Sequence, residues 1–459
     1  MEAADRARFQ LFAVLWALAL LLYHRWHWFP SDVRALPMIA AAFVLLRPSS
    51  PGRLLACVAL QTVFAYRDLP EANTNRTLMV FLGASILGAW PVAAWRARGV
   101  PSATQWLACF EPVLRVQLLL VYAWACWHKL NVDFFDITRS CGVQIYLKVA
   151  ERVPFLPWPT GPTALSAVVF GTAAAEGLLP ILLLARRTRL AGLALGLALH
   201  FGFGLTMFYD FSMTMMALLF LFAPPELART LLEDPRLSLR RRLGMSPRAW
   251  AWAVPLAALA FILVTRAVFW DMYDVFALAW WLLLGAYALV GRTLAGRRWL
   301  QPRTRELLRM PLVLGIFPLA IFLNGLCPFI GSKTETAFAM YSNLRTEGGV
   351  TNHLIVPRPL AWFDYQTDLV TIESSSDEAL AELAAEGHPV PFYVLRKRVA
   401  ELVEAGAREI AITYVRAGER RVVAQAEVDA ELADAPSYFE RKFLRFRTIL
   451  PADANVCSH

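Results

Sequence analysis

Lysine is scarce in this chain of 459 residues: only five of its 45 basic side chains are lysine, at positions 129, 148, 333, 397 and 442. Charge is also sparse, since charged residues make up 18% of the chain and hydrophobic residues 58%, with a mean hydropathy of +0.46. A chain this apolar cannot bury its hydrophobic surface in one soluble core. The composition therefore excludes an ordinary soluble protein and predicts a polytopic membrane protein.

The common short motifs of cofactor sites and catalysis are missing. There is no GxGxxG, P-loop, HExxH or GxSxG sequence to support a nucleotide, zinc or acyl-transfer site. The six cysteines form no CxxC pair and show no metal-ligand spacing, so we expect no metal site. The net charge of +9 comes mostly from arginines in short loops, which indicates membrane topology rather than nucleic-acid binding.

Apolar runs long enough, or almost long enough, to span a membrane recur along the chain. Two of them, 36–46 and 212–223, are short for a hydrocarbon core of ~30 Å and are expected to be half-helices or re-entrant segments. We predict an all-α polytopic membrane helical bundle with about nine to eleven membrane segments. The runs lie at about 9–28, 36–46, 53–66, 77–95, 106–128, 163–184, 190–208, 212–223, 249–268, 274–290 and 310–328.

Arginine fixes the expected orientation. Arginines cluster after alternate runs, with six in the 224–248 loop and six more in 291–309, and all of these clusters fall on one side if the N-terminus is cytoplasmic. The chain after residue 329 is then expected outside the cytoplasm. We divide the chain into a membrane domain, 1–344, and a small extracytoplasmic α+β C-terminal domain, 345–459. In the latter we expect helices at 379–385 and 393–405 and a hairpin of 410–415 with 421–426.

Lys129 is the first candidate for chemistry. It ends an apolar run and is followed by polar Asn131 and Asp133, with His128 before it. Arginine keeps its proton in proteins, whereas a desolvated lysine can become a neutral amine and act as a base. The alternative is that Lys129, close to the outer end of its helix, extends its ammonium to the membrane surface.

Glu176 and His200 are expected at a common depth on consecutive antiparallel helices, roughly 15 Å from one membrane surface. Ionisable side chains within a membrane usually face the bundle interior or a water-filled pocket, so we consider both to be pocket residues. The alternative is a purely structural hydrogen-bonded pair between two helices.

Two polar segments are expected on the same side as Lys129. The stretch from Met340 to His353 is either a connector or a loop that folds over an outer cavity and contributes His353. The segment 71–76 contributes Asn75 or Arg76 to the cavity, or its asparagines cap a helix.

Three of these segments resemble the HTTM group of bacterial membrane proteins, which is related to vitamin K-dependent gamma-glutamyl carboxylase. Tyr122 to Phe135 is similar to the carboxylases' Lys-Lys-Leu-Asp-Ala-Asp stretch, whose second lysine is the proposed base. Glu176 to Pro224 and the segment from Tyr341 onward are similar to their histidine-containing helix and to the chain after their last membrane helix. The resemblance implies Lys129 as base, with His200 and His353 as further polar catalytic groups.

The resemblance also implies a substrate class. It predicts oxygenation of a vitamin K or menaquinone-type hydroquinone, with O2 and CO2 as co-substrates and a peptide or protein as a further partner on the outer face. His128, Asn131, Glu176, Asn75 and Arg76 would then surround the quinol. Two departures stand out: Asn75-Arg76 replaces an Asn-His pair of the carboxylases, and the C-terminal domain is much shorter than theirs.

Two hypotheses therefore stand beside each other. One is a quinol-oxidising membrane enzyme with Lys129 as general base. The other is a non-catalytic quinone- or lipid-binding membrane protein, or a partner of a redox enzyme, on the same scaffold. A transporter is disfavoured because the chain shows no repeated half with matching broken helices.

Overall fold

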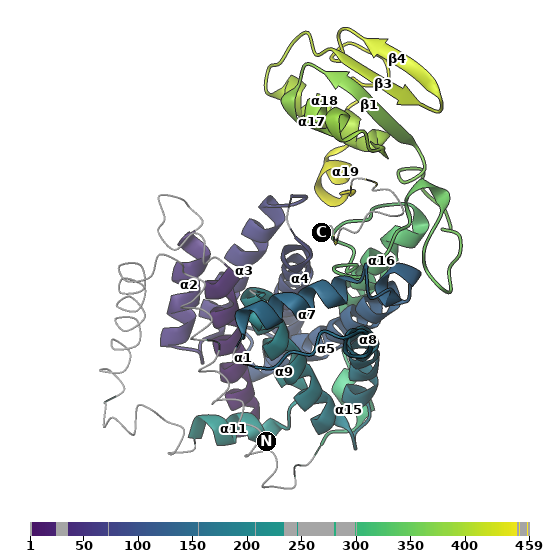
Figure 1. Ribbon diagram of the computed structural model, residues 1–459. Helices are drawn as coiled ribbons and strands as arrows, with labels where there is room; N and C mark the ends of the chain where they lie inside the picture. The colour runs from purple at the N-terminus through teal and green to yellow at the C-terminus, as the bar shows by residue number, and fades with distance from the viewer. Residues whose placement is uncertain are drawn as a thin grey trace.

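The computed structural model describes residues 2–23, 35–71, 73–154, 156–206, 208–233 and 301–447, together with 246, 280, 299, 449 and 457. Within these residues the chain forms a helical bundle and, near the C-terminus, one small antiparallel sheet (Figure 1). The predicted runs 249–268 and 274–290 lie outside the described residues, apart from Trp280.

The described residues of the other nine predicted apolar runs fall mainly on helices, and residues 24–28 of the first run lie outside the described residues. The bundle consists of α1 (Glu2–Tyr23), α2 (Ala35–Leu46), α3 (Pro51–Arg67), α4 (Thr74–Ala97), α5 (Ala103–Lys129), α8 (Pro162–Leu184), α9 (Arg189–Leu205), α10 (Tyr209–Leu219) with the 3-10 turn η2 (Phe220–Phe222), and α16 (Ile316–Leu326) between the 3-10 turns η3 (Leu312–Gly315) and η4 (Cys327–Ile330). Shorter helices are α6 (Val132–Phe135), α7 (Cys141–Arg152), α11 (Pro225–Glu233) and α15 (Thr304–Leu308).

Five of the described helices are long and apolar enough to cross a membrane: α1, α4, α5, α8 and the Leu312–Ile330 segment. The pair Tyr209–Phe222 and Pro225–Leu232 is bent by 116°, which fits either a broken sixth span or a re-entrant segment. The helices α2 and α9 are apolar but shorter. This is the pattern of a multi-pass membrane protein, while the expected total of nine to eleven segments stays a prediction.

Local sequence explains where the helices begin. Pro51 opens α3 behind Ser50, whose hydroxyl accepts from the Arg53 N–H. Asn73 caps α4 in the same way through the Arg76 N–H, which confirms that an asparagine of the 71–76 segment caps a helix. Ser102 and Gln105 form a capping box at the start of α5.

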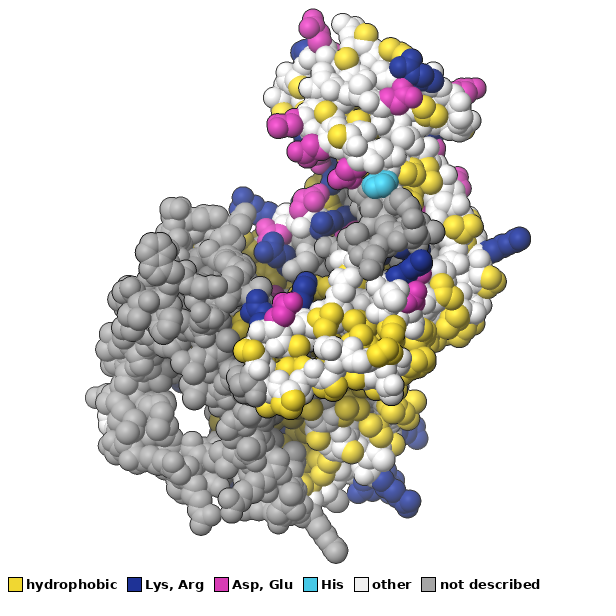
Figure 2. Space-filling model, in the orientation of Figure 1, with side chains coloured by type: hydrophobic (Ala, Val, Ile, Leu, Met, Phe, Trp, Pro, Cys, Tyr) yellow, Lys and Arg dark blue, Asp and Glu magenta, His cyan; other side chains and the backbone are white. Residues whose placement is uncertain are grey.

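Large apolar side chains remain exposed on the outside of the bundle. They include Phe170, Leu178 and Ile181 on α8, and Ile316 and Leu319 on α16. Figure 2 shows yellow side chains over the described part of the bundle and more charged side chains over the sheet-bearing end. A soluble monomer rarely exposes apolar patches of this extent, whereas lipid tails cover them without cost.

The sheet has the strand order β2-β1-β3-β4 and is antiparallel throughout. Its strands are β1 (Leu369–Ser375), β2 (Val390–Pro391), β3 (Ile412–Arg416) and β4 (Glu419–Val423). The helices α17 (Glu378–Glu386) and α18 (Phe392–Glu404) share with it a separate apolar core around Leu395, Val399 and Tyr414. The predicted helices and hairpin are thereby confirmed, with the turn made by Ala417 and Gly418 at positive φ.

Polar contacts hold this C-terminal region against the α3–α4 loop. Lys397 forms an ion pair with Glu71 at 2.8 Å, and Lys442 of α19 (Tyr438–Phe443) donates to the Leu69 carbonyl at 2.9 Å. A disulfide joins Cys141, the first residue of α7, to Cys457. The sheet-bearing region therefore lies at the same end of the bundle as the α3–α4 loop.

Candidate functional site

An apolar cavity lies where the end of α5 meets α7, α8, α9 and the chain after the last span. It contains about 770 Å³ of empty space, including its opening. Aromatic and aliphatic side chains dominate its wall, and the charged groups are those of Lys129 and Glu176. The lining residues are Thr74, Leu78, Val121, Ala125, Lys129, Gly142, Ile145, Thr172, Glu176, Phe203, Phe208, Phe211, Phe338, Met340 and Tyr341.

Lys129 and Glu176 form an ion pair at the wall of this cavity. Nζ of Lys129 lies 2.8 Å from Oε2 of Glu176, and each side chain is only 6% exposed. Apart from this ion pair, Oε2 has no polar partner in the described part of the chain. The charge pair is thus buried, while the carboxylate oxygen keeps an acceptor site for a bound group.

The Lys129 side chain runs back along its own helix rather than out to the membrane surface. Its Nζ lies 3.5 Å from the carbonyl of Ala125, one turn earlier, and 5.7 Å from the centre of the Phe134 ring. Side chains on a helix tilt toward its N-terminus, so a lysine at a C-terminal end can point inward. The structure shows this inward conformation and not the surface-seeking one.

His200 lies behind the cavity wall. Its Nε2 makes a short hydrogen bond with the Tyr122 hydroxyl, and its ring contacts Phe203 and Phe211, which do line the cavity. Its Nδ1 is buried and has no hydrogen-bond partner among the described residues. The two membrane-embedded residues expected at a common depth therefore pair separately, Glu176 with Lys129 and His200 with Tyr122.

His128 and Asn131 face away from the cavity. The His128 ring stacks between Trp124 and Phe329, with its two nitrogens 3.1 and 3.0 Å from the carbonyls of Phe338 and Gly325. A neutral imidazole can donate to only one of them. Asn131 caps α6 through the Phe134 N–H and donates to the carbonyls of His128 and Ser342, so its polar atoms are already used.

His353 also has both ring nitrogens occupied. Nε2 donates to the Trp127 carbonyl at 2.9 Å, and Nδ1 accepts from the backbone N–H groups of Ile355 and Val356. Burial lowers the pKa of His353, which agrees with a neutral ring in these roles. The structure places His353 beside the end of α5 but outside the cavity lining.

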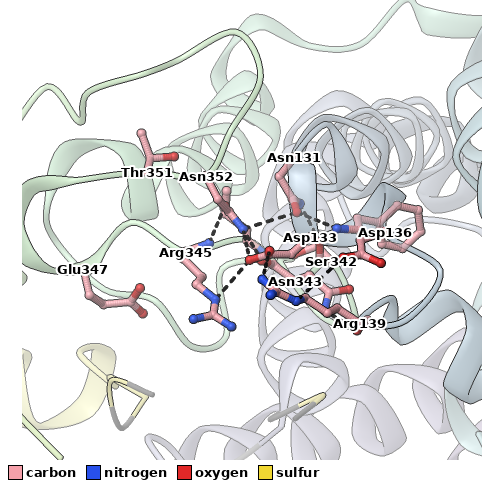
Figure 3. Close-up of polar contacts among 12 residues, drawn as sticks. Asn131, Asp133, Asp136, Arg139, Ser342, Asn343, Arg345, Glu347, Thr351 and Asn352 are labelled. Atoms are coloured by element: carbon pink, nitrogen blue, oxygen red, sulfur yellow. Dashed lines mark hydrogen bonds and ion pairs between the residues drawn. The ribbon is translucent and has the colours of Figure 1, made fainter. Parts of the chain in front are cut away.

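A cluster of polar side chains joins the chain after α5 to the chain after the last span (Figure 3). Asp133 contacts Arg139 and Arg345, and accepts a 2.8 Å hydrogen bond from Asn352. Asn352 donates as well to the Asn343 carbonyl, and its own carbonyl accepts from the Val132 N–H. This Asp133 cluster fixes both the end of α5, with Lys129, and the loop that carries Tyr341.

Two more polar cavities adjoin the apolar one. Asn75 lines the first, where it donates to Asp210 at 2.7 Å, and Arg76 lines the second, where it pairs with Asp68 and lies over the Tyr23 ring. Neither residue lines the cavity that contains Lys129. The two polar cavities share Phe208 and Tyr341 with the apolar cavity, and these two rings are 5.3 Å apart.

Sequence reasoning did not identify the aromatic wall of the site. Phe203 and Phe208 lie in an apolar run and Phe211 and Phe338 lie outside the runs, and the chain has 29 phenylalanines, so no shared feature of the sequence predicts that these four line a cavity. Tyr341 gave a weak signal as an aromatic residue in a polar stretch. The helix α7, which contributes Gly142 and Ile145, was missed because it is short and amphipathic.

The described residues contain no group of three or more His, Cys, Asp or Glu side chains placed to hold a metal ion. What the site offers is a buried ion pair, an unused carboxylate acceptor and aromatic walls. Comparison of the chain with protein-family models, with curated proteins and with solved structures found no match.

Proposed function

We propose that this protein is an integral membrane enzyme that binds a lipid-soluble hydroquinone of the menaquinol type and removes a proton from it. The observation that carries the proposal is the Lys129–Glu176 ion pair, buried at the wall of an apolar, aromatic-lined cavity. Buried charge within a membrane bundle is costly and commonly marks a functional site.

The lining of the cavity suits the chemistry of such a ligand. Binding pockets for small molecules are mostly apolar with a few convergent polar groups. Phe203, Phe211 and Tyr341 provide ring surfaces for a flat ligand. Lys129 and Glu176 provide the polar groups that a ring hydroxyl would meet.

The pair can accept a proton without creating an unbalanced buried charge. A hydroxyl proton taken up at the Glu176 carboxylate leaves that side chain neutral and the Lys129 ammonium free to face the negative oxygen left on the ring. Charge is conserved in this step, and the attraction between Lys129 and the ring oxygen replaces that between Lys129 and Glu176. Alternatively Lys129 passes its proton to Glu176 and receives the hydroxyl proton itself, which reaches the same end state.

When bound, a hydroquinone supplies a ring that becomes reactive toward O2 once deprotonated. The resemblance to carboxylases extends this proposal to oxygenation of the quinol and to carboxylation, with CO2, of a peptide or protein at the outer face. Arg76 and Asn75 line the polar cavities next to the site, and these are the routes by which such water-soluble partners would approach.

Two observations support an outward-facing site. Arginine-rich loops cluster on the opposite side of the membrane segments, as expected for cytoplasmic loops. Cys141, at the end of the bundle that carries Lys129, is joined to Cys457 by a disulfide, and disulfides persist mainly outside the cytoplasm. We infer a cytoplasmic N-terminus and an extracytoplasmic C-terminal region.

A second candidate function is quinone or lipid binding without catalysis, and one observation favours it. Lys129 forms an ion pair with Glu176, and a lysine held this way is an ammonium, which is not itself a base. In a binding protein the same pair would hydrogen-bond a quinone oxygen and transfer no proton.

The test compares variants of the full chain in lipid nanodiscs for retained quinone and for O2 uptake with reduced menaquinone. We expect Lys129→Ala and Glu176→Gln each to lower O2 uptake by about 100-fold or more, the range for loss of a general base. Small primary amines should partly restore Lys129→Ala. Arg187→Ala, which removes an exposed basic side chain that lines none of these cavities, is the control and should keep full activity.

Lys129→Arg keeps the charge and removes the amine base, so it tests the route in which Lys129 receives the hydroxyl proton. That route predicts lost turnover with retained quinone, whereas direct uptake of the proton by Glu176 predicts that turnover persists. Full O2 uptake by Lys129→Arg would rule out Lys129 as the base, and bound quinone without O2 uptake in the unmodified protein would select the binding function.

A further inference from the structure

The C-terminal region contains another pocket, whose lining shares no residue with that of the Lys129 cavity. It holds about 690 Å³ of empty space and is open to solvent. Five of its eight lining residues are aromatic. The lining consists of Trp362, Phe363, Asp364, Tyr365, Asp368, Phe392, Tyr393 and Arg396.

The rings of this pocket form a connected group. Phe363 and Tyr365 stack with their centroids 6.1 Å apart, and Tyr393 meets Tyr365 edge-on at 5.7 Å. Trp362 is 67% exposed at the rim, which is unusual for so large an apolar side chain. Aromatic faces carry partial negative charge, and several rings around one space attract cations, quaternary ammonium groups above all.

The formal charges around the pocket leave an excess of negative charge. Asp368 is neutralised by Arg416, which donates to both of its oxygens, and the guanidinium of Arg396 is held by Asp434. The Asp364 carboxylate forms no ion pair with any residue that the structure describes. A cation in the pocket would therefore meet an uncompensated carboxylate as well as ring faces.

A second carboxylate lies close behind the rings. Glu440 accepts a 2.6 Å hydrogen bond from the Tyr365 hydroxyl and a 2.7 Å hydrogen bond from the Ser437 N–H, and it forms no ion pair in the described part of the chain. The hydroxyl of Tyr393 is buried and has no hydrogen-bond partner there. Glu440 therefore adds negative charge behind the pocket, and the Tyr393 hydroxyl leaves one polar group of its wall unused.

The pocket is fastened to the end of the last membrane span. Phe363 donates its backbone N–H to the Ile330 carbonyl at 3.0 Å, and Leu360 donates to Phe329 at 2.7 Å. The same loop exposes Leu354, Ile355 and Leu360 beside Trp362. Exposed tryptophan and aliphatic residues next to the end of a span are typical of the level at which lipid headgroups lie.

From these observations we propose that this pocket binds the alkylammonium headgroup of a membrane phospholipid, with the rings of Trp362, Tyr365 and Tyr393 around the cation and Asp364 as its counter-ion. The site would anchor the C-terminal region to the membrane surface. This inference does not depend on the quinol chemistry proposed for Lys129.

Isothermal titration of the full chain in a non-ionic detergent tests the proposal. The probes are choline, its neutral isostere 3,3-dimethylbutanol, and short-chain phosphatidylcholine and phosphatidylglycerol with identical acyl chains. We expect choline and phosphatidylcholine to bind and the other two not to. Trp362→Ala and Asp364→Asn should each weaken phosphatidylcholine binding by about tenfold, as expected for loss of one cation–π or charge contact.

Glu382→Gln removes an exposed acidic side chain elsewhere on α17 and should leave binding unchanged. Equal binding of choline and its neutral isostere, or unchanged binding by Asp364→Asn, would overturn recognition of a cation. Binding of choline without phosphatidylcholine, or equal binding of the two lipids, would overturn the assignment to a lipid headgroup.

Discussion

The contacts of each side chain indicate which predicted residues have a structural role at this site and which could take part in chemistry. Lys129 points inward to Glu176, which a lysine that merely extends to the membrane surface would not do. His128, Asn131 and His353 have their polar atoms engaged with backbone groups, and this accounts for polar residues around Lys129 without giving them contact with a ligand. Of the predicted residues, Lys129 and Glu176 line the cavity.

His353 predicts a dependence of stability on pH. Burial lowers its pKa below the usual 6.5, so protonation favours the unfolded chain. The stabilisation by neutral His353 is complete above about pH 6.5 and declines as the pH falls toward its pKa in the folded protein. We expect the melting temperature of the protein to fall more steeply between pH 7 and 5 than that of His353→Gln; parallel curves would contradict this.

Lys333 is a buried lysine that, unlike Lys129, forms no ion pair with any described residue. Its Nζ donates a hydrogen bond to the Thr336 hydroxyl. Burial lowers its pKa to about 8. The ammonium therefore destabilises the fold below pH 8, and stability rises with pH from about 8 to 10.5. We expect Lys333→Met to stabilise the protein at pH 7 by about 1–3 kcal/mol, with the gain shrinking at higher pH.

The measurement is thermal unfolding of both proteins at pH 7 and pH 10. Lys148→Met, at an exposed lysine on α7, serves as the control and should change stability by less than about 0.5 kcal/mol. Destabilisation by Lys333→Met at pH 7 would show that its hydrogen bond outweighs the cost of burying its charge.

At the level of secondary structure, long apolar helices were predictable and short amphipathic ones were not. The spans α4, α5 and α8 follow from runs of apolar residues, with capping side chains at the starts of α4 and α5 and Pro162 at the start of α8. The 12-residue α7 has neither the length nor the uniform hydrophobicity of a span, and its place over the cavity depends on packing against α8 and α9. The approach of residues 342–353 to the end of α5 likewise depends on contacts across about 200 residues of sequence.

The Asp133 cluster should set the stability of this junction. Asp133→Asn leaves the partly exposed Arg139 and Arg345 without the buried carboxylate that they share, and we expect a loss of about 1–3 kcal/mol. Asp136→Asn, one turn later and half-exposed, is the matched control and should cost less than about 1 kcal/mol. Thermal unfolding of the two variants tests this. Equal losses of stability would show that Asp133 contributes no more than the half-exposed Asp136.

On the scale of the whole molecule, sequence predicted a membrane bundle with a small α+β region after it, but not how the parts are joined. Cys141 and Cys457 are the two cysteines outside the apolar helices, and sequence alone gave no reason to pair residues 316 positions apart. The cavity too was only partly predictable, because its aromatic wall comes from four separate helices and loops. Charged residues in a membrane stand out in a sequence, whereas phenylalanines that line a cavity do not.

The disulfide makes the proposed orientation testable. In intact cells, a membrane-impermeant maleimide should label Cys457 only after treatment with an impermeant reductant. The buried Cys57 should stay unlabelled throughout. Labelling that requires permeabilised membranes would place this end of the bundle in the cytoplasm, and labelling without reductant would show that the disulfide is absent.

The central claim is that the Lys129–Glu176 pair meets the ring oxygen of a hydroquinone. The most direct test is an experimental structure of the protein with a bound menaquinol analogue. The account predicts the ring in the cavity between Phe211 and Tyr341, with one ring oxygen within about 3 Å of Lys129 Nζ or a Glu176 carboxylate oxygen. A quinone bound elsewhere while the Lys129–Glu176 pair stays intact and out of contact with it would contradict the account.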